Sequence, residues 1–483
     1  MRKILLVEPN YKNKYPPIGI MKLATYYRCL GDDVTFFKGD LRLLVLENTY
    51  DALLKQLYAN DDSIFWEKYK PEICQYIQRG TVDSLSKIPL INEDIIIFEL
   101  FRYYRKYFKD KDYFLPENRI YDVVGITSLF TFHWDITIET INFAKKLCKK
   151  EENVMVGGVM ASILQDRVEE ATGIRPYRGT LSTPGQLDFG NNMIIDTLPL
   201  DYSILEETDY VYPTSDAYFA YTTRGCVNKC PFCAVPKLEP MYKDYIPIIE
   251  QIKYTNEKFG GKKDLLLLDN NVLASHQYNR IIDEIKAAGF TLGSSFITPN
   301  KFEIAIKNLR EGYNERGYIK AVVRQYKLLL DRYGDKLRDI YNLLEQYNLL
   351  NDYTAKKKAI FATYKEVKPW FEKFYNRKGR ARYVDFNQGI DSRLINDANM
   401  KKMSEIPVRP VRIAFDHWYL HDIYENAVRT AVKQGHKDLS NYILYNYEDT
   451  PLELYLRLRL NVYLCEELKV DIYSFPMKYS KST

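Results

Sequence analysis

The chain has 483 residues, of which 46% are hydrophobic and 28% charged, and its formal net charge is +5. This length predicts two or three globular domains, and so small a charge does not by itself require nucleic acid or an anionic membrane. No stretch approaches the roughly 20 apolar residues that span a bilayer. The first apolar run ends at Glu8 and Pro9, too early for a signal peptide. We therefore expect a cytoplasmic protein with no membrane partner. Its seven cysteines, an odd number, argue against a disulfide framework.

Strands and helices alternate in the first part of the chain. Helices are expected near residues 20–30 and 135–147, and short apolar runs predict strands at 4–7, 34–37, 123–127 and 154–156. This alternation favours a parallel, flavodoxin- or Rossmann-like sheet in an α/β domain over residues 1–165. Residues 41–118 interrupt the series and are expected to be mostly helical. Residues 166–216 show little periodicity and are expected to form a linker.

A second α/β series is expected over residues 217–476. Its predicted strands are 217–223, 264–268, 383–387, 411–415, 441–445 and 470–473. Thr450, Pro451 and Glu453 form the capping box of one helix between them. Six strand–helix units are fewer than the eight of a closed barrel, so the pattern predicts a partial (β/α)6 barrel.

Residues 301–382 interrupt the second series and are expected to form a helical insertion. The insertion has twice as many Lys and Arg as Asp and Glu, together with many tyrosines. Positive charge and aromatic rings together suit a nucleic-acid surface. An amphipathic helical hairpin, with tyrosines packed and lysines in water, explains the same pattern. The insertion lies between the second and third predicted strands, so we expect it to cap the mouth of the barrel.

Three cysteines crowd into the segment directly after the first strand of the second series. Cys226, Cys230 and Cys233 have the spacing C-x3-C-x2-C. Thiolates bind iron–sulfur clusters and zinc, and three of them leave one iron of a cubane cluster open. A structural zinc needs a fourth ligand, but the nearest downstream Cys or His is the isolated His276. Three core thiols are a further alternative, although a Gly- and Pro-containing loop normally runs over the surface.

This loop resembles the signature of the radical S-adenosylmethionine (SAM) superfamily, in which an aromatic residue, here Phe232, precedes the last cysteine. The resemblance implies a [4Fe–4S] cluster whose open iron chelates SAM. An electron from a donor such as flavodoxin or ferredoxin would then cleave SAM to methionine and a 5′-deoxyadenosyl radical. The cofactor would carry the difficult chemistry, and the protein would supply position and exclusion of solvent.

The resemblance extends to the ends of the next four predicted strands. Asp269, Asn270 and Asn271 stand where the family often has Gly-Gly-Glu, which receives the SAM amino group. Polar residues follow the later strands as well, and the family uses these places for SAM or substrate: Gln388, Asp391, Arg393, Asp416 and Asn446. A polar turn at Asp269 to Asn271, and a surface salt bridge between Asp391 and Arg393, are the structural alternatives.

The first domain resembles the cobalamin-binding domains that precede many radical SAM barrels. Pro16-Pro17-Ile18-Gly19 and Gly157-Gly158 carry this resemblance. The stretch after the first strand has no D-x-H-x-x-G histidine, so cobalamin binding stays open. Methylthiotransferases of similar architecture hold a second cluster on three N-terminal cysteines. Here Cys29 and Cys148 fall in helix patterns and are expected to be core thiols, with Cys74 as the third cysteine of this part.

The leading hypothesis is a radical SAM enzyme that abstracts hydrogen from an unknown substrate or assists its methylation through cobalamin. One alternative is an RNA-modifying, methylthiotransferase-like radical SAM enzyme. The other is a zinc-stabilised protein that binds nucleic acid through residues 301–382.

Overall fold

The computed structural model describes residues 1–88 and 94–479. The chain begins with an all-parallel sheet in the strand order β2-β1-β3-β4. Its strands are β1 (Lys3–Glu8), β2 (Asp33–Lys38), β3 (Val123–Ser128) and β4 (Val154–Gly158). This is the order of the first four strands in a flavodoxin-like sheet, so the predicted parallel α/β architecture of the first domain is confirmed.

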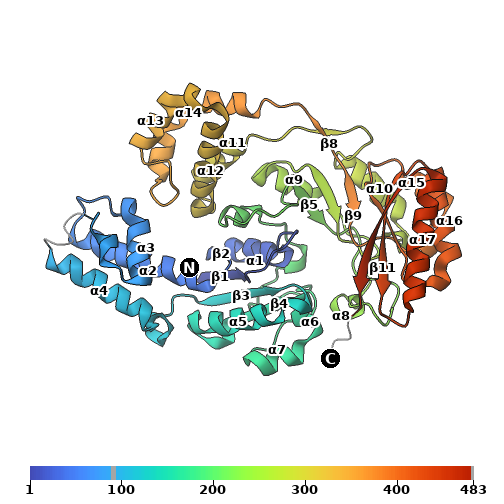
Figure 1. Ribbon diagram of the computed structural model, residues 1–483, viewed down its shortest axis with the longest axis horizontal. Coiled ribbons are helices and arrows are strands. Elements are labelled where there is room, and N and C mark those ends of the chain that lie inside the picture. The colour runs from blue at the N-terminus through green and yellow to red at the C-terminus, as the bar shows by residue number, and fades with distance from the viewer. Residues whose placement is uncertain (89–93, 480–483) are drawn as a thin grey trace.

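Alternate residues of β1 pack on opposite faces of this sheet. Ile4 and Leu6 pack against α1 (Ile18–Cys29), whereas Leu5 and Val7 pack against the side that carries α5 (Trp134–Ala144). Figure 1 shows the sheet between α1 on one side and α5 and α7 on the other. The short helices α6 (Val159–Ile163) and α7 (Gln165–Thr172) follow β4. Both faces are covered, as the apolar strands require.

The first insertion is helical, as predicted, in its described part. It contains α2 (Leu41–Asn60), α3 (Lys70–Arg79) and α4 (Ile95–Lys109), and residues 89–93 lie outside the described residues. These helices enclose a core of their own around Trp66, whose side chain is fully buried.

The second series contains the six predicted strands, all parallel to their neighbours. They form two three-stranded sheets with the orders β5-β6-β9 and β10-β11-β12, and the bridge between Ile390 and Ile413 links the two. The strands are β5 (Ala217–Ala220), β6 (Asp264–Leu267), β9 (Val384–Phe386), β10 (Val411–Ala414), β11 (Asp438–Tyr445) and β12 (Asp471–Lys478). The helices between them are α8 (Val235–Leu238), α9 (Ile249–Phe259), α10 (Tyr278–Ala287), α15 (Asp397–Met403), α16 (His421–Lys433) and α17 (Pro451–Leu468).

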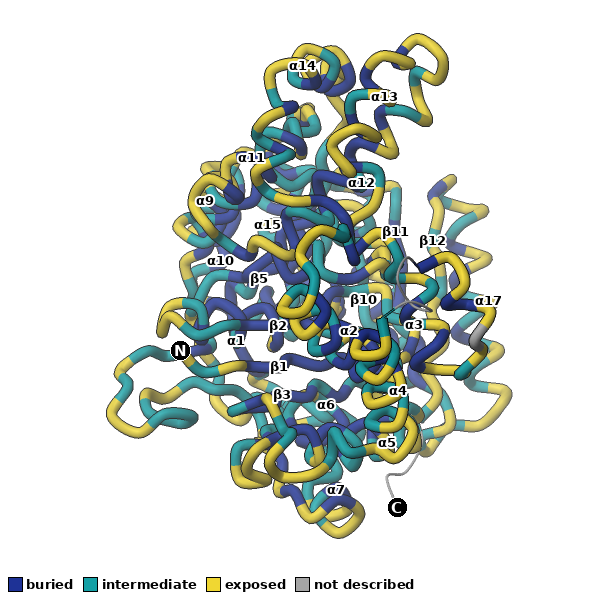
Figure 2. The backbone as a smooth tube through the Cα atoms, turned by 90° about the vertical axis from the view of Figure 1, so that its left-hand side faces the viewer, coloured by how far each residue is buried: buried dark blue, intermediate teal, exposed yellow. Residues whose placement is uncertain are grey.

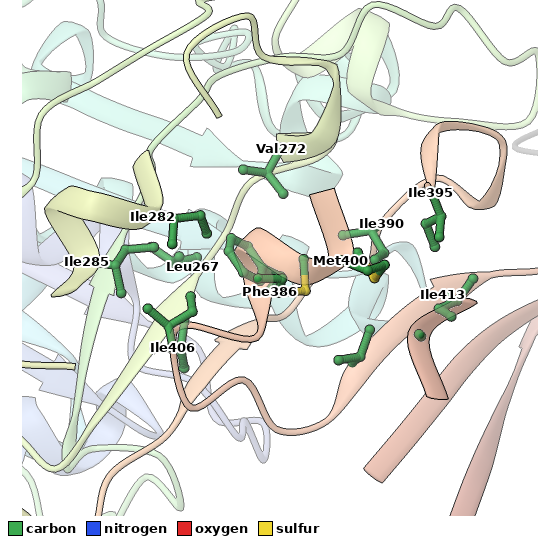
Figure 3. Close-up of a cluster of buried hydrophobic side chains, with 14 of the residues drawn as sticks. Leu267, Val272, Ile282, Ile285, Phe386, Ile390, Ile395, Met400, Ile406 and Ile413 are labelled. Atoms are coloured by element: carbon green, nitrogen blue, oxygen red, sulfur yellow. The ribbon is translucent and has the colours of Figure 1, made fainter. Parts of the chain in front are cut away.

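One face of this second series packs against its helices, and the other face of β5 and β6 packs against the first domain. Leu267 and Phe386 point into a core with Ile285 and Met400 (Figure 3). The neighbouring Leu266 belongs instead to the core that includes α1. The first domain therefore covers the inner side of β5 and β6.

The second insertion does not cap the carboxyl ends of the strands, contrary to the expectation. It contains α11 (Lys301–Arg310), α12 (Glu315–Tyr333), α13 (Arg338–Gln346) and α14 (Lys357–Tyr375). Its base is the antiparallel pair β7 (Ser295–Phe296) and β8 (Arg380–Ala381), which lies between α10 and the start of β9. A segment between a helix and the next strand lies at the amino ends of parallel strands. Accordingly, Arg382 donates hydrogen bonds to the carbonyls of Lys262 and Lys263, just before β6.

The insertion helices have their own core, with Phe302 and Phe371 stacked 4.0 Å apart. Figure 2 shows α13 and α14 projecting from the body of the molecule with exposed outer turns, whereas β1 is buried. Four basic side chains of the insertion pair with acids elsewhere in the chain: Lys320 with Asp209, Arg324 with Glu206, Lys356 with Glu67 and Arg380 with Asp216. Part of the positive charge is therefore used to attach the insertion.

Residues 166–216 connect the two strand series and are held to the first by buried ion pairs. Arg28 of α1 pairs with Asp201 at 2.9 Å and with Glu207 at 3.2 Å, and both carboxylates are buried. After α7, short 3-10 turns at Ile195–Thr197 and Tyr202–Glu206 interrupt an irregular backbone. Within the two described ranges, every helix is too short or too polar to cross a bilayer.

Candidate functional site

The three clustered cysteines lie on the loop at the carboxyl end of β5, as predicted. The strand ends at Ala220, earlier than expected, because Asp269 after β6 takes the backbone N–H groups of Thr222 and Thr223. The same Asp269 oxygen accepts both threonine hydroxyls, at 2.7 and 2.8 Å. Asp269 thus fixes the start of the cysteine loop to the neighbouring strand.

The sulfur atoms receive several hydrogen bonds. The backbone N–H of Asn228 lies 3.4 Å from Cys226 Sγ, and that of Val235 lies 3.5 Å from Cys233 Sγ. The Asn271 side-chain amide lies 3.9 Å from Cys226 Sγ. Donors aimed at sulfur stabilise a thiolate and help to set the potential of an iron–sulfur cluster. These donors therefore fit metal-bound thiolates at Cys226 and Cys233.

The three thiols lie close enough together to affect the pKa of Cys230 and of Cys233. Burial raises the pKa of Cys230 and of Cys233, and the Asp416 carboxylate raises both further. Binding a cation reverses this balance because it stabilises the thiolate form. In the part of the chain that the structure describes, no three His, Cys, Asp or Glu side chains already converge as a metal site.

Glu239 closes the cysteine loop, a role that no pattern in the sequence indicates. One carboxylate oxygen lies 2.6 Å from the guanidinium of Arg224, just before the loop. The other accepts the backbone N–H of Gly225 at 2.9 Å and the side-chain amide of Asn270 at 2.8 Å. Arg224 also pairs with Asp196 at 2.5 Å, and its side chain is 10% exposed. The two ends of the loop are thereby held together at nearly buried ion pairs.

The predicted residues after β6 all contact the cysteine loop. Asp269 is 1% exposed. Burial raises its pKa, and this effect outweighs the hydrogen bonds from Thr222 and Thr223, which lower it. Asn270 and Asn271 contact Glu239 and Cys226. Asp269 Oδ2 and Asn271 Oδ1 are buried without a hydrogen-bond partner among the described residues. Asp269 is therefore built into the wall of the site, whereas Asn271 keeps an acceptor available beside the cysteines.

The residues predicted after β9 divide between the site and the surface. Asp391 accepts a hydrogen bond of 2.9 Å from Asn228 of the cysteine loop. Asp391 also forms a salt bridge with Arg393 through two hydrogen bonds of 2.7 and 2.8 Å. This salt bridge is the structural alternative to a role of these two residues in binding SAM. Gln388 is exposed. Asn387, which the sequence did not indicate, accepts a 2.7 Å hydrogen bond from Tyr15 of the first domain.

The ends of β10 and β11 contact the cysteine loop through aromatic rings. Phe232 lies 5.7 Å from the His417 ring and 5.3 Å from the Tyr447 ring. Asp416 lies beside the thiols, and burial raises its pKa. Asn446, by contrast, adopts a left-handed conformation and donates its amide to the carbonyl of Tyr479. It stabilises the turn after β11 instead of pointing toward the cysteines.

A buried arginine organises these two strand ends and was also missed. Arg457 of α17 is fully buried and donates to the carbonyls of Asp416 and Leu444, at 2.7 and 2.6 Å. It further pairs with Asp449 at 2.7 Å. Arg457 shares α17 with Glu453, Arg459 and Glu466, so nothing local in the sequence distinguishes it as the buried charge.

The three cysteines of the first domain lie on separate elements. Cys29 ends α1 and is exposed, so the prediction that it is a core thiol is wrong. The last turn of α1 turns it toward solvent. Cys148 is buried, although it follows the helix rather than lying within it, and Cys74 lies partly buried in α3.

No protein-family model matches the chain, and no curated protein sequence matches it. The chemistry of the site therefore rests on its own residues. These provide three cysteines, two of them with N–H donors at sulfur, together with amides at two strand ends, an ion-paired arginine and a buried carboxylate.

Proposed function

We propose that this chain is a radical SAM enzyme whose cluster is held by Cys226, Cys230 and Cys233. The observation that carries the proposal is the C-x3-C-x2-C loop at the carboxyl end of the first of six parallel strands. We interpret these strands as a partial (β/α)6 barrel of the radical SAM type. Barrels of parallel strands place their chemistry at this end.

When bound, a [4Fe–4S] cluster would supply the single electron that cleaves SAM. The residues of the chain would hold and orient the reactants. The three thiolates would leave one coordination position without a protein ligand. Asn271 would offer its free amide oxygen to the SAM amino group, and Arg393 could exchange its bond to Asp391 for the SAM carboxylate. Asp416 would accept hydrogen bonds from ribose hydroxyls. Gln388 and Asn446 have less support, because the first is exposed and the second faces Tyr479.

The electron donor in this proposal is a reduced flavodoxin or ferredoxin, and the substrate is of unknown class. Nucleic acid remains a prediction for residues 301–382. Their position at the amino ends of the strands gives the RNA-modifying alternative no specific support. A zinc-stabilised protein is the outcome that the following experiment separates.

The test is anaerobic reconstitution of the full chain with iron and sulfide, followed by a SAM-cleavage assay with dithionite. We expect a brown protein that releases 5′-deoxyadenosine. Cys230→Ala should lose both the colour and the product. Cys465→Ala, a partly buried thiol on α17, is the matched control and should keep both. A colourless protein that holds zinc, or a Cys230→Ala variant as active as the native chain, would refute the proposal.

A further inference from the structure

The carboxyl edge of the first sheet is the place where a ligand would be expected. In the order β2-β1-β3-β4, the chain changes direction between β1 and β3. Open parallel sheets bind ligands in the crevice outside this switch point. Here the crevice lies between the segment after β1, with Tyr11, and the segment after β3, with His133.

Two aromatic rings fill this crevice. The Tyr11 and His133 rings stack with their centroids 4.4 Å apart and an angle of 9° between their planes. Tyr11 is only 6% exposed. The ring of the neighbouring Phe132 lies 4.5 Å from the His133 ring and is tilted against it by 56°. The two segments are therefore in direct contact across the switch point.

A buried ion pair lies beside the rings. Glu8 and Lys38 are the last residues of β1 and β2, and their charged atoms are 3.1 Å apart. Their side chains are 1% and 3% exposed. The Lys38 ammonium also donates to the carbonyl of Tyr11 at 2.8 Å. Charges buried so deeply need partners on every side.

The remaining partners come from the segment that leads into β5. The Tyr212 hydroxyl donates to Glu8, and its side chain is 1% exposed. The rings of Tyr210 and Tyr212 lie 4.4 and 5.5 Å from the Lys38 ammonium. The Tyr210 hydroxyl binds both backbone groups of Asn13, at 2.8 and 2.6 Å. Residues 210–214 thus cross the edge of the sheet and are held there by polar contacts.

We propose that the first domain binds no cobalamin and that its switch-point crevice instead holds residues 210–214 of the same chain. A corrin placed on these strand ends would displace Tyr11 and Tyr212. Glu8 and Lys38 would then lose hydrogen bonds while still buried, which is costly. The crevice serves to anchor the start of the second strand series, since β5 begins only three residues beyond this segment. The inference does not depend on a cluster at the cysteine loop.

The first test uses the unmodified full chain and hydroxocobalamin. After incubation and desalting, the protein fraction should contain no corrin absorbance. Hydrogen exchange of residues 208–216 should be the same with and without hydroxocobalamin. Corrin that stays with the protein in a one-to-one ratio would overturn the proposal. The iron content and SAM cleavage of the same preparation report separately on the proposed function.

The second test addresses the anchoring role. Tyr212→Phe removes only the hydroxyl that donates to Glu8, and Lys38→Met removes the buried ammonium. Both should accelerate amide hydrogen exchange in residues 208–216, Lys38→Met the more strongly. Tyr473→Phe, at a ring that is 66% exposed on β12, is the matched control and should change nothing there. Exchange at the native rate in both variants would refute the anchoring role.

Discussion

Glu239 and Arg224 join the two ends of the cysteine loop through an ion pair of 2.6 Å. Arg224 precedes Cys226 by two residues, and Glu239 follows Cys233 by six. Because the side chains are only 10% and 12% exposed, little solvent weakens the pair. The loop is thus closed by its own charges, independently of any bound group.

Replacing Glu239 should loosen this closure. Glu239→Gln keeps the shape but leaves Arg224 with Asp196 as its remaining acid, so we expect a stability loss of about 1–3 kcal/mol. The yield of reconstituted iron should fall, and the electron paramagnetic resonance signal of the reduced cluster should change. Glu239→Asp, which keeps the carboxylate, should restore part of the iron yield and part of the native signal. Glu250→Gln, at a carboxylate that is 78% exposed on α9, is the control. An unchanged signal in Glu239→Gln would contradict the role of Glu239 in holding the cysteine loop in place.

Arg457 should be one of the most sensitive charged positions of the chain. Arg457→Met leaves Asp449 and three backbone carbonyls without their donor, and removing one partner of a buried ion pair costs about 3–5 kcal/mol. The comparison is Arg429→Met on the neighbouring α16. Arg429 is 35% exposed, and surface ion pairs contribute about 0–1 kcal/mol. Urea denaturation of both variants measures the difference. Equal losses of stability in the two variants would show that buried Arg457 contributes no more than exposed Arg429.

Asn314 should be critical for attaching the second insertion. It adopts a left-handed conformation with φ of 39°, and its amide donates to the Ser203 carbonyl and to Glu207, each at 3.0 Å. Asn314→Ala loses these bonds, the helix cap and the tolerance of asparagine for this conformation. We expect destabilisation of about 3 kcal/mol. Asn300→Ala removes only the cap of α11, at about 1 kcal/mol. Hydrogen exchange in α12 measures the effect. If it is no faster in Asn314→Ala than in Asn300→Ala, Asn314 is not critical for attaching the insertion.

Asp188 should contribute to acid sensitivity. Burial raises its pKa, but hydrogen bonds from Arg2 and Tyr26 outweigh burial and hold the pKa below the ordinary value. A lowered folded-state pKa adds stability above the unfolded-state value of about 3.9. This stability is lost as the pH falls through the folded-state value. The stability difference between the native chain and Asp188→Asn should therefore be constant above about pH 5 and shrink at lower pH. Urea titrations across this range provide the measurement. Asp166→Asn, at a side chain that is 90% exposed, controls for the loss of one surface charge. A pH-independent difference would argue against the pairing.

The alternation of strands and helices could be predicted because it depends on local patterns. All ten strands expected in the two series are present, with ends that differ by a few residues. One difference has a clear cause. The strand expected over residues 217–223 stops at Ala220, because Asp269 takes the amides of Thr222 and Thr223 that would otherwise extend the ladder. That contact joins residues 46 and 47 positions apart, beyond the reach of a periodicity argument.

The site was predictable in its cysteines and only partly in their surroundings. Cys226, Cys230 and Cys233 form a contiguous pattern, and the residues after β6 follow from the topology of parallel strands. The neighbours that hold the loop are different. Glu239 and Arg457 belong to helical or irregular segments in which most acids and arginines face water, so their burial has no local signature.

The sequence was sufficient to predict the two parallel strand series, the helical character of both insertions and the position of three thiols at one strand end. These follow from apolar periodicity and from close spacing along the chain. Three further features emerge only from the folded chain: the second insertion lies at the amino ends of the strands, Arg457 clamps two strand ends, and Tyr11 and Tyr212 occupy the edge of the first sheet. Each of these depends on pairing between distant segments. Burying a charge or a hydroxyl is costly unless a partner meets it, and the fold alone brings that partner into place.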